Sequence, residues 1–377
     1  KDIAAADAEL NALTAKGPTT MIAVERDRQP ASYILARGVH SARGERVFPA
    51  PPHFLPGASN PAPDRLALAD WTLAPTNPLT ARVAVNRIWQ ELFGTGLVDT
   101  PDDFGVMGAR PTHPELLDWL AVEFRESGWD VKLLYRRLVR TATYRQSPVV
   151  RPDHLQVDPQ NRLLARGPRH RLDAEVLRDV ALQAGGLLGD RVGGPSFKGY
   201  QPEGLWQAVS MPESDTYRYK QDTGAELYRR SLYAFWKRFA PPPALETFDA
   251  PAREVACPRR PRTNTPLQAL ALMNEPQFVE SCRKLAERLL REAQEENARY
   301  DLLAALLLSR PLADAERAVL QGSRQQFATH YAAHPDQAAL LLKVGAAPAD
   351  TNLPPTEVAA WTLVASQALN LDETICK

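Results

Sequence analysis

A nearly unbroken apolar pattern follows the pair Asn77-Pro78. An asparagine before a proline is typical of a helix start, because its side chain caps free backbone amides and proline needs no amide partner in the first turn. We therefore predict a helix over residues 79–93, which Gly94 ends. Apolar residues occupy almost every side of this helix, and such a pattern indicates a buried helix.

Three polar residues interrupt this apolar helix: Arg82, Asn86 and Arg87. Buried polar groups need hydrogen-bond partners. Asp102 and Asp103 follow in a loop rich in glycine and proline. We predict that Arg87 or Asn86 bonds to Asp102 or Asp103 and so fixes this loop to the core.

Capping residues, glycine stops and apolar residues three or four positions apart predict further helices. Thr112 and Glu115 have the spacing of a capping box before one of them, which Gly128 ends. The predicted helices beyond the first are residues 3–16, 64–71, 116–124, 131–141, 169–188, 267–273, 277–293, 302–308, 314–327, 335–342 and 356–371.

Credible strands are few. Residues 20–25 and 31–37 are short β-like runs and predict a small hairpin. Residues 38–62 are rich in proline and lack periodicity, so an extended strap is expected there. Residues 229–239 fit a buried strand or an irregular apolar segment, with the strand preferred. The expected fold class is mainly α, an irregular helical body with long proline-rich ordered loops and a small β-hairpin.

Composition excludes few functions. The 377 residues include 45 basic and 45 acidic side chains, so no net charge favours nucleic acid. No apolar stretch reaches the roughly 18 residues of a membrane span. The opening KDIAAADAEL is not a signal peptide, which suggests a processed or fragmentary chain. One local basic run, PRRPR at residues 258–262, suits either an anion or internal pairing, and internal pairing is preferred.

The three cysteines, Cys257, Cys282 and Cys376, lie far apart and outside any CxxC or CxxCH unit. They therefore give no local signature of a metal or covalent haem site, and no cofactor is predicted within this chain. Cys282 is in step with an apolar helical face, where a free cysteine acts as a small hydrophobic residue.

Three segments resemble a known family. They are NPLTARVAVNRIWQELFGTGLVDTPDDFGVMGARPTHPELLDWLA, RRSLYAFWKRFAPPPALETFDAPAREVACPRRPRTNTPLQALALMNEPQFVE and WTLVASQALNLDETI. All three are similar to the planctomycete-type domain called PSD1 or DUF1553, a domain of unknown function. The resemblance covers roughly residues 64–374.

The resemblance implies a periplasmic or secreted setting and frequent fusion to cytochrome c-like and DUF1549 domains, but no established activity. A CxxCH haem motif is not among these residues. The domain division expected from the resemblance is 1–63, the connector or tail of a preceding domain with the hairpin and strap, and 64–377, a helical DUF1553-like domain.

Candidate catalytic residues cluster after the first helix: Asp102, Asp103, His113 and Glu115. In a cleft, such side chains provide a general acid and base. The alternative is structural, because the same residues suit turns, helix capping and pairing with arginine, and we prefer it.

Candidate ligand-binding residues are spread more widely. One set is polar and lies on proline-rich loops, where binding residues are often found. The other set is aromatic: Trp206, Tyr217 and Tyr219 lie in apparent loops, and their rings suit a sugar. The candidates are Arg87, Trp206, Tyr217, Tyr219, Arg262, Thr263, Asn264 and Gln268.

Two functions are compatible with these patterns. The first is an extracytoplasmic binding or scaffold module associated with a cytochrome c-like domain or protein. The alternative is a hydrolase or lyase that acts on an extracellular polysaccharide through loop carboxylates and a histidine. Paired carboxylates in an open cleft would favour the enzyme, whereas the same acids locked to arginine would favour the scaffold.

Overall fold

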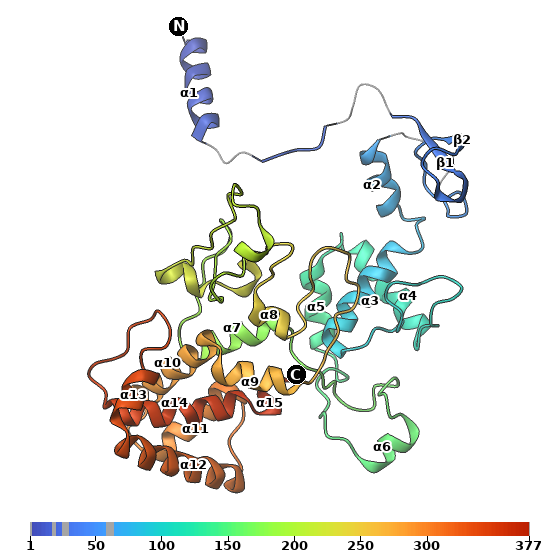
Figure 1. Cartoon of the computed structure of the whole chain (residues 1–377). Helices are drawn as coiled ribbons and strands as arrows, with labels where there is room; N and C mark the ends of the chain where they lie inside the picture. The colour runs from blue at the N-terminus through green and yellow to red at the C-terminus, as the bar shows by residue number, and fades with distance from the viewer. Residues whose placement is uncertain (1, 17–19, 25–29, 58–63, 377) are drawn as a thin grey trace. The chain divides into compact units, whose positions relative to one another are not determined.

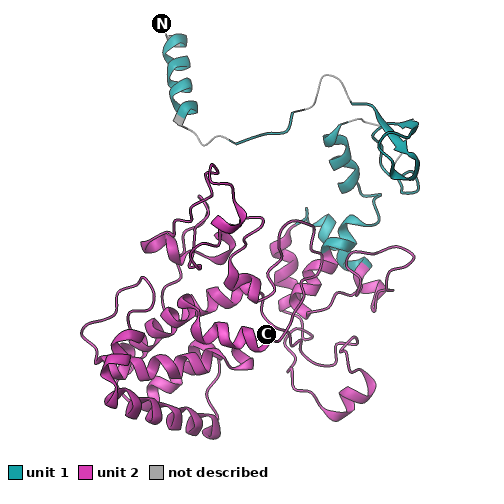
Figure 2. Ribbon diagram, in the orientation of Figure 1, with its two compact units in different colours: residues 1–84, 118–129 teal, residues 85–117, 130–377 magenta. Residues whose placement is uncertain are grey.

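The computed structural model describes residues 2–16, 20–24, 30–57 and 64–376. The chain is mainly α-helical, as predicted (Figure 1). It divides into two compact units (Figure 2). Unit 1 comprises residues 1–84 and 118–129, and unit 2 comprises residues 85–117 and 130–377. In the described part of the chain, no helix has the length and apolar character needed to cross a membrane.

Unit 1 holds a hairpin, two helices and parts of two more. Helices α3 and α4 each have residues in both units. The elements are α1 (Asp2–Lys16), β1 (Ser32–Leu35), β2 (Arg43–Val47), α2 (Arg65–Leu73), the start of α3 (Thr80–Phe93) and most of α4 (Pro114–Glu126).

The hairpin is present, but its predicted first strand is wrong, whereas the second predicted run, residues 31–37, contains β1. β1 pairs antiparallel with β2, with Ser32 opposite Val47, and β2 lies in the region expected to be a strap. Residues 20–24 form no strand, and Glu25 lies outside the described residues. β2 reads RGERV and is exposed throughout, so it buries no side chain and leaves no apolar alternation for sequence analysis to detect.

The helix starts of unit 1 follow the predicted caps. Oδ1 of Asp64 accepts a hydrogen bond from the backbone N–H of Ala67 at 2.8 Å, at the start of α2. Oδ1 of Asn77 accepts from the backbone N–H of Leu79 at 3.0 Å and of Thr80 at 3.3 Å. These bonds satisfy amides that have no partner inside the helix.

Helix α3 is buried on one side only. Val85 and Trp89 are buried, whereas Arg87 and Glu91 are exposed. The expectation of burial all round was therefore wrong, because Arg87 and Glu91 lie one turn apart and form a polar side. Gly94 ends the helix with a φ of +83°, a conformation that side chains disfavour.

Unit 2 is built around the long helix α10 (Pro276–Glu292). It contacts α7 (Ala174–Ala184) and α14 (Pro355–Leu369), and α14 in turn contacts α12 (Asp314–Ala333) (Figure 1). The other helices of the unit are α5 (Val131–Val139), α6 (Pro152–Val157), α8 (Pro243–Thr247), α9 (Pro266–Asn274), α11 (Glu296–Leu307), α13 (Pro335–Leu341) and α15 (Asp372–Ile375).

The core of unit 2 is the interface of these helices. Cys282, Leu285 and Leu289 of α10 are buried against Trp361 and Val364 of α14 and their neighbours. Cys282 is thus part of the apolar core, as predicted from its helical phase.

Two predictions for unit 2 need correction. The helix expected over residues 169–188 is α7 and begins only at Ala174. Residues 229–239 are irregular, with a 3-10 helix at Ser231–Tyr233 and isolated bridges, one of which joins Phe197 to Ala234. The backbone N–H of Phe197 donates to Tyr233, and its carbonyl accepts from Phe235. These two bonds do not continue into a ladder, so the alternating aromatic pattern reflects packing on two sides of the segment.

Candidate functional site

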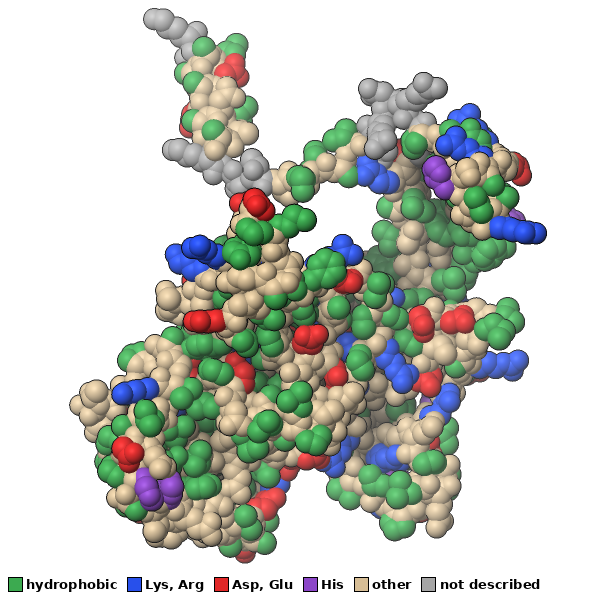
Figure 3. Space-filling view, viewed as in Figure 1, with side chains coloured by type: hydrophobic (Ala, Val, Ile, Leu, Met, Phe, Trp, Pro, Cys, Tyr) green, Lys and Arg blue, Asp and Glu red, His purple; other side chains and the backbone are tan. Residues whose placement is uncertain are grey.

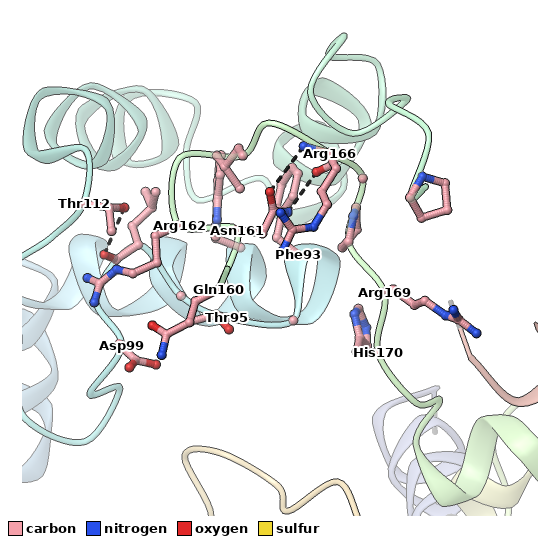
Figure 4. A pocket seen from close by; sticks show the side chains of 18 of the residues that line it. Phe93, Thr95, Asp99, Thr112, Gln160, Asn161, Arg162, Arg166, Arg169 and His170 are labelled. Atoms are coloured by element: carbon pink, nitrogen blue, oxygen red, sulfur yellow. Dashed lines mark hydrogen bonds between the residues drawn. The ribbon is translucent and has the colours of Figure 1, made fainter. Parts of the chain in front are cut away.

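A cavity with a volume of about 590 Å³ lies within unit 2. Most of its lining comes from the loop after α3 (residues 94–99), the segment 148–170, and Arg259 with Arg262. Figure 4 shows the first two of these parts, with Thr95, Asp99 and Arg162 among the labelled residues. We call this cavity the basic cleft, because five arginines and the single acid Asp99 line it within the described chain: Arg162, Arg166, Arg169, Arg259 and Arg262.

The loop after α3 is fixed by Asn86, which is fully buried. Its Oδ1 accepts from the N–H of Val98 at 2.8 Å, and its Nδ2 donates to the carbonyl of Val98 at 3.0 Å. Gly96 lies against this amide, since a Cβ there would approach Nδ2 of Asn86 to 2.6 Å. The sequence therefore needs a glycine at this wall of the cleft.

The segment 158–166 is fixed by bonds within itself. Asp158 accepts the backbone N–H groups of Arg162 at 2.9 Å and Leu163 at 2.7 Å. The guanidinium of Arg166 donates to the carbonyls of Asp158 at 3.0 Å and Pro159 at 2.7 Å. Carbonyl oxygens are dipoles and not anions, so these bonds position the charge of Arg166 without neutralising it.

Arg162 is the most available cation of the basic cleft. Its side chain is exposed, lines the cleft, and forms no hydrogen bond or ion pair with any described residue. Arg169 is paired with Asp372 instead, and Arg259 with Asp99 at 3.1 Å.

The side chain of Arg262 is exposed overall, and its guanidinium lies at the edge of the cleft. Its Nη1 donates to the carbonyl of Gly94 at 3.3 Å. Burial lowers the pKa of Arg262, Asp173 opposes that shift, and Arg259 and Arg260 add to it through repulsion. An anion here would relieve this repulsion between cations.

A second cavity, of about 380 Å³, adjoins the basic cleft and is also lined by arginines. Gly94, Thr95, Arg259 and Arg262 line both cavities. Arg87 lines the second cavity; it is exposed, and no described residue bonds to its side chain. We call this the Arg87 cavity.

Two other charged residues of the Arg87 cavity are already paired. Arg260 donates to both oxygens of Glu175, at 2.6 and 3.3 Å. Glu91 accepts a hydrogen bond from Tyr135. Internal pairing of the PRRPR run is therefore present, and it coexists with a cationic cavity wall.

The predicted bond from α3 to Asp102 or Asp103 is wrong. Asn86 uses its amide on the backbone of Val98, Arg87 points to the exposed side, and Asp102 is exposed. Asp103 caps its own turn, where Oδ1 accepts from the N–H of Gly105 at 2.8 Å. The loop is fixed to the core as expected, but through main-chain atoms.

The structure does not bring the four candidate catalytic residues into either cavity, as far as the described lining goes. Besides Asp102 and Asp103, these are His113, whose Nδ1 lies 2.9 Å from Oγ1 of Thr112, and the exposed Glu115. α4 begins at Pro114, so the spacing of Thr112 and Glu115 misses the capping box by one residue.

Among the candidate ligand-binding residues, Arg87 and Arg262 lie at the cavities. Two others, Thr263 and Gln268, form a hydrogen-bond network with Asp249. Its carboxylate accepts from the N–H of Thr263 at 2.7 Å, and Nε2 of Gln268 donates to Oγ1 of Thr263 at 2.9 Å. Asn264 accepts from Arg171 at 2.7 Å.

The candidate aromatic residues lie away from both cavities. Trp206 is 2% exposed and contacts Tyr219 edge to face, with ring centroids 4.8 Å apart. Oη of Tyr219 donates to the carbonyl of Gly199 at 2.5 Å, and Tyr217 is half-buried. Trp206 is therefore a core residue, although its neighbours in sequence suggested a loop.

Arg162, Arg166 and Arg169 were not predicted from the sequence as site residues. The only available signal was the density of arginines in RLLARGPRHR at residues 162–171, beside the PRRPR run that was noticed. About 90 residues separate these two runs, so only the fold shows that they share one cavity.

Comparison with known proteins gave one match. Searches of curated proteins and of solved structures found nothing similar. The sequence model of a family described as PSD1, protein of unknown function (DUF1553), matches residues 64–323. Since that range is more than half of the 377 residues, the chain belongs to the PSD1 (DUF1553) family.

Proposed function

We propose that unit 2 is an extracytoplasmic binding module whose basic cleft holds an anionic glycan. The observation that carries the proposal is Arg162, an exposed guanidinium that has no partner among the described residues and lies in a cavity lined by four further arginines. A guanidinium presents a planar fork of N–H donors that matches carboxylate and sulfate groups. A cavity of about 590 Å³ is of the size that encloses a small ligand.

The acids favour binding over hydrolysis. A glycosidase needs two carboxylates that face the scissile bond. Asp99 lines the cleft, but it is engaged by Arg259 at 3.1 Å. Asp102 and Asp103 belong to a separate turn, as described above. The pairing of Asp99 with Arg259 therefore supports a binding role more than a catalytic one.

The aromatic residues favour a glycan over single-stranded nucleic acid. Nucleic-acid grooves expose aromatic faces on which bases stack. Trp89 and Phe93 line the basic cleft, but they stack on each other with centroids 4.2 Å apart and are buried. The zero net charge points the same way. A cytochrome c-like domain or protein is the proposed partner, in line with the family resemblance.

The test is calorimetric titration with a short sulfated oligosaccharide, a heparin-derived tetrasaccharide, and with a neutral oligosaccharide of equal length. We expect binding of the sulfated probe only, with affinity that falls as salt rises. Arg162→Gln should weaken it by about tenfold, because a charge-assisted hydrogen bond is lost.

Arg151→Gln is the matched control. Arg151 is an exposed arginine of the same segment; it pairs with Asp153 and is not among the residues that line either cavity. Equal loss of affinity in both variants would contradict the proposal, as would equal binding of the neutral probe. Chromatography of the titrated oligosaccharide decides the enzymatic alternative, since shortened products would reveal cleavage.

A further inference from the structure

We infer that the ligand is a linear polyanionic glycan that occupies the basic cleft and the Arg87 cavity together, with one anionic group at Arg162 and another at Arg87. The inference rests on the proposed function and adds the length and charge pattern of the ligand. Its basis is that two cavities share a wall and each presents one exposed guanidinium that bonds to no described residue.

The wall that the two cavities share leaves room for a ligand chain to pass over it. It consists of Gly94, Thr95, Arg259 and Arg262. Gly94 has no side chain, and a Cβ there would come within 3.0 Å of Nδ1 of His170. The two arginines are held down by Asp99 and by the carbonyl of Gly94. A ligand therefore meets backbone and tethered side chains at this point.

The other arginines of the two cavities are bonded within the protein. Arg169, Arg259 and Arg260 pair with acids, whereas Arg166 and Arg262 donate to carbonyl oxygens. Arg162 and Arg87 differ from these because each is exposed and bonds to no other described side chain. They come from segments 75 residues apart in sequence, so neither run of arginines alone creates the pair.

The volumes of the two cavities indicate the size of the ligand. Cavities of about 300–1,000 Å³ enclose drug-sized ligands, and these two measure about 590 and 380 Å³. A short oligosaccharide fills one, whereas a polymer reaches both. Figure 3 shows Lys and Arg side chains between the α6 segment and the rest of unit 2. A repeating charged polymer supplies anions at both points without any further contact.

Occupation of two linked subsites predicts a gain in affinity with chain length, because the second contact becomes intramolecular. The probes are a heparin-derived tetrasaccharide and dodecasaccharide, titrated into the full chain. We expect the dodecasaccharide to bind at least about tenfold more tightly per molecule. Arg87→Gln should remove most of this gain, whereas Arg162→Gln should weaken both probes.

The outcomes separate the two proposals. The inference is overturned if the longer probe gains affinity only statistically and Arg87→Gln leaves the ratio of the two affinities unchanged. The proposed binding function would still be supported by the effect of Arg162→Gln. If neither probe binds, the proposed function itself fails. Arg151→Gln serves again as the control for loss of one exposed arginine, and thermal melts confirm that each variant is folded.

Discussion

The side-chain amide of Asn86 pairs with both backbone groups of Val98, accepting its N–H at 2.8 Å and donating to its carbonyl at 3.0 Å. This pair joins α3 to the wall of the basic cleft. Because Asn86 and Val98 are both buried, water cannot replace either bond. These two hydrogen bonds therefore fix Gly96 and Leu97 at the wall of the cleft.

Asn86→Ala should destabilise the protein by about 2–5 kcal/mol, since it strands a buried donor and a buried acceptor. Chemical denaturation followed by circular dichroism measures this. Arg87→Met is the matched control from the next position; Arg87 is exposed, so a change within about 0.5 kcal/mol is expected. Equal unfolding midpoints for Asn86→Ala and the parent would show that the amide pair does not fix the loop.

Local signals predicted the helices well, because a cap is a short-range interaction. Asp64, Asn77, Asp130 and Thr265 each cap the helix expected after them, and Thr265 forms a capping box with Gln268. The hairpin shows the opposite case. An exposed strand buries nothing, so β2 carries no apolar period.

The sequence also indicated that a polar residue inside α3 needs a partner, but it could not say which. An amide can pair with an acid or with a peptide group, and Asn86 pairs with a peptide group. The basic cleft was harder still. Arg259 reaches Asp99 across 160 positions, and no local pattern encodes such a contact.

Gly345 offers a second stability prediction. It has a φ of +92°, and a Cβ there would lie 2.4 Å from Cδ of Glu280. Glu280 cannot move away, because Tyr228 and the N–H of Ala347 bond to it at 2.8 and 2.6 Å. Gly345→Ala should therefore cost about 2–5 kcal/mol.

The control for this prediction is Gly322→Ala in the middle of α12, where a Cβ meets nothing within 4 Å. Alanine suits a helix interior better than glycine, so this variant should gain about 0.5–1 kcal/mol. Both values come from denaturant midpoints. A Gly345→Ala protein as stable as the parent would mean that the loop before α14 does not press on Glu280.

The buried pair of α10 gives a third prediction. Nη1 of Arg283 lies 2.9 Å from Oε1 of Glu287, and both side chains are almost fully buried. Glu287→Gln leaves the Arg283 charge without its anion and should cost about 3–5 kcal/mol. Asp153→Asn breaks the exposed pair with Arg151 and should cost about 0–1 kcal/mol. Similar thermal melts for the two variants would refute the difference.

Thiol labelling tests the burial of the core. Cys282 is buried, and burial raises the pKa of its thiol to about 12, whereas Cys257 is exposed. Only a thiolate that solvent reaches reacts with a disulfide reagent. In the native protein Cys257 should react first, and Cys282 only at the rate of unfolding. Mass mapping after partial labelling distinguishes them, and early modification of Cys282 would contradict the described packing of α10.

Glu275, which caps α10, gives a prediction about pH. Burial raises the pKa of this carboxyl from 4.5 to about 7, although the N–H groups of Phe278 and Gln277 and the charge of Arg178 oppose the shift. Because the folded state holds the proton more tightly than the unfolded state, this group contributes stability at low pH. That contribution is lost as the pH rises from about 4.5 to 7.

Denaturant titration at several pH values measures the free energy of unfolding of the parent and of Glu275→Gln. The difference between the two should fall between pH 4.5 and 7 and stay level above pH 7. Glu316→Gln is the matched control with the opposite sign. Arg310 lowers the pKa of Glu316 to about 2, so its contribution is lost only as the pH falls from 4.5 towards 2. Relative to Glu316→Gln, the parent should show no change between pH 4.5 and 7. A rise for Glu275 across that window would mean that its hydrogen bonds to the start of α10 outweigh its burial.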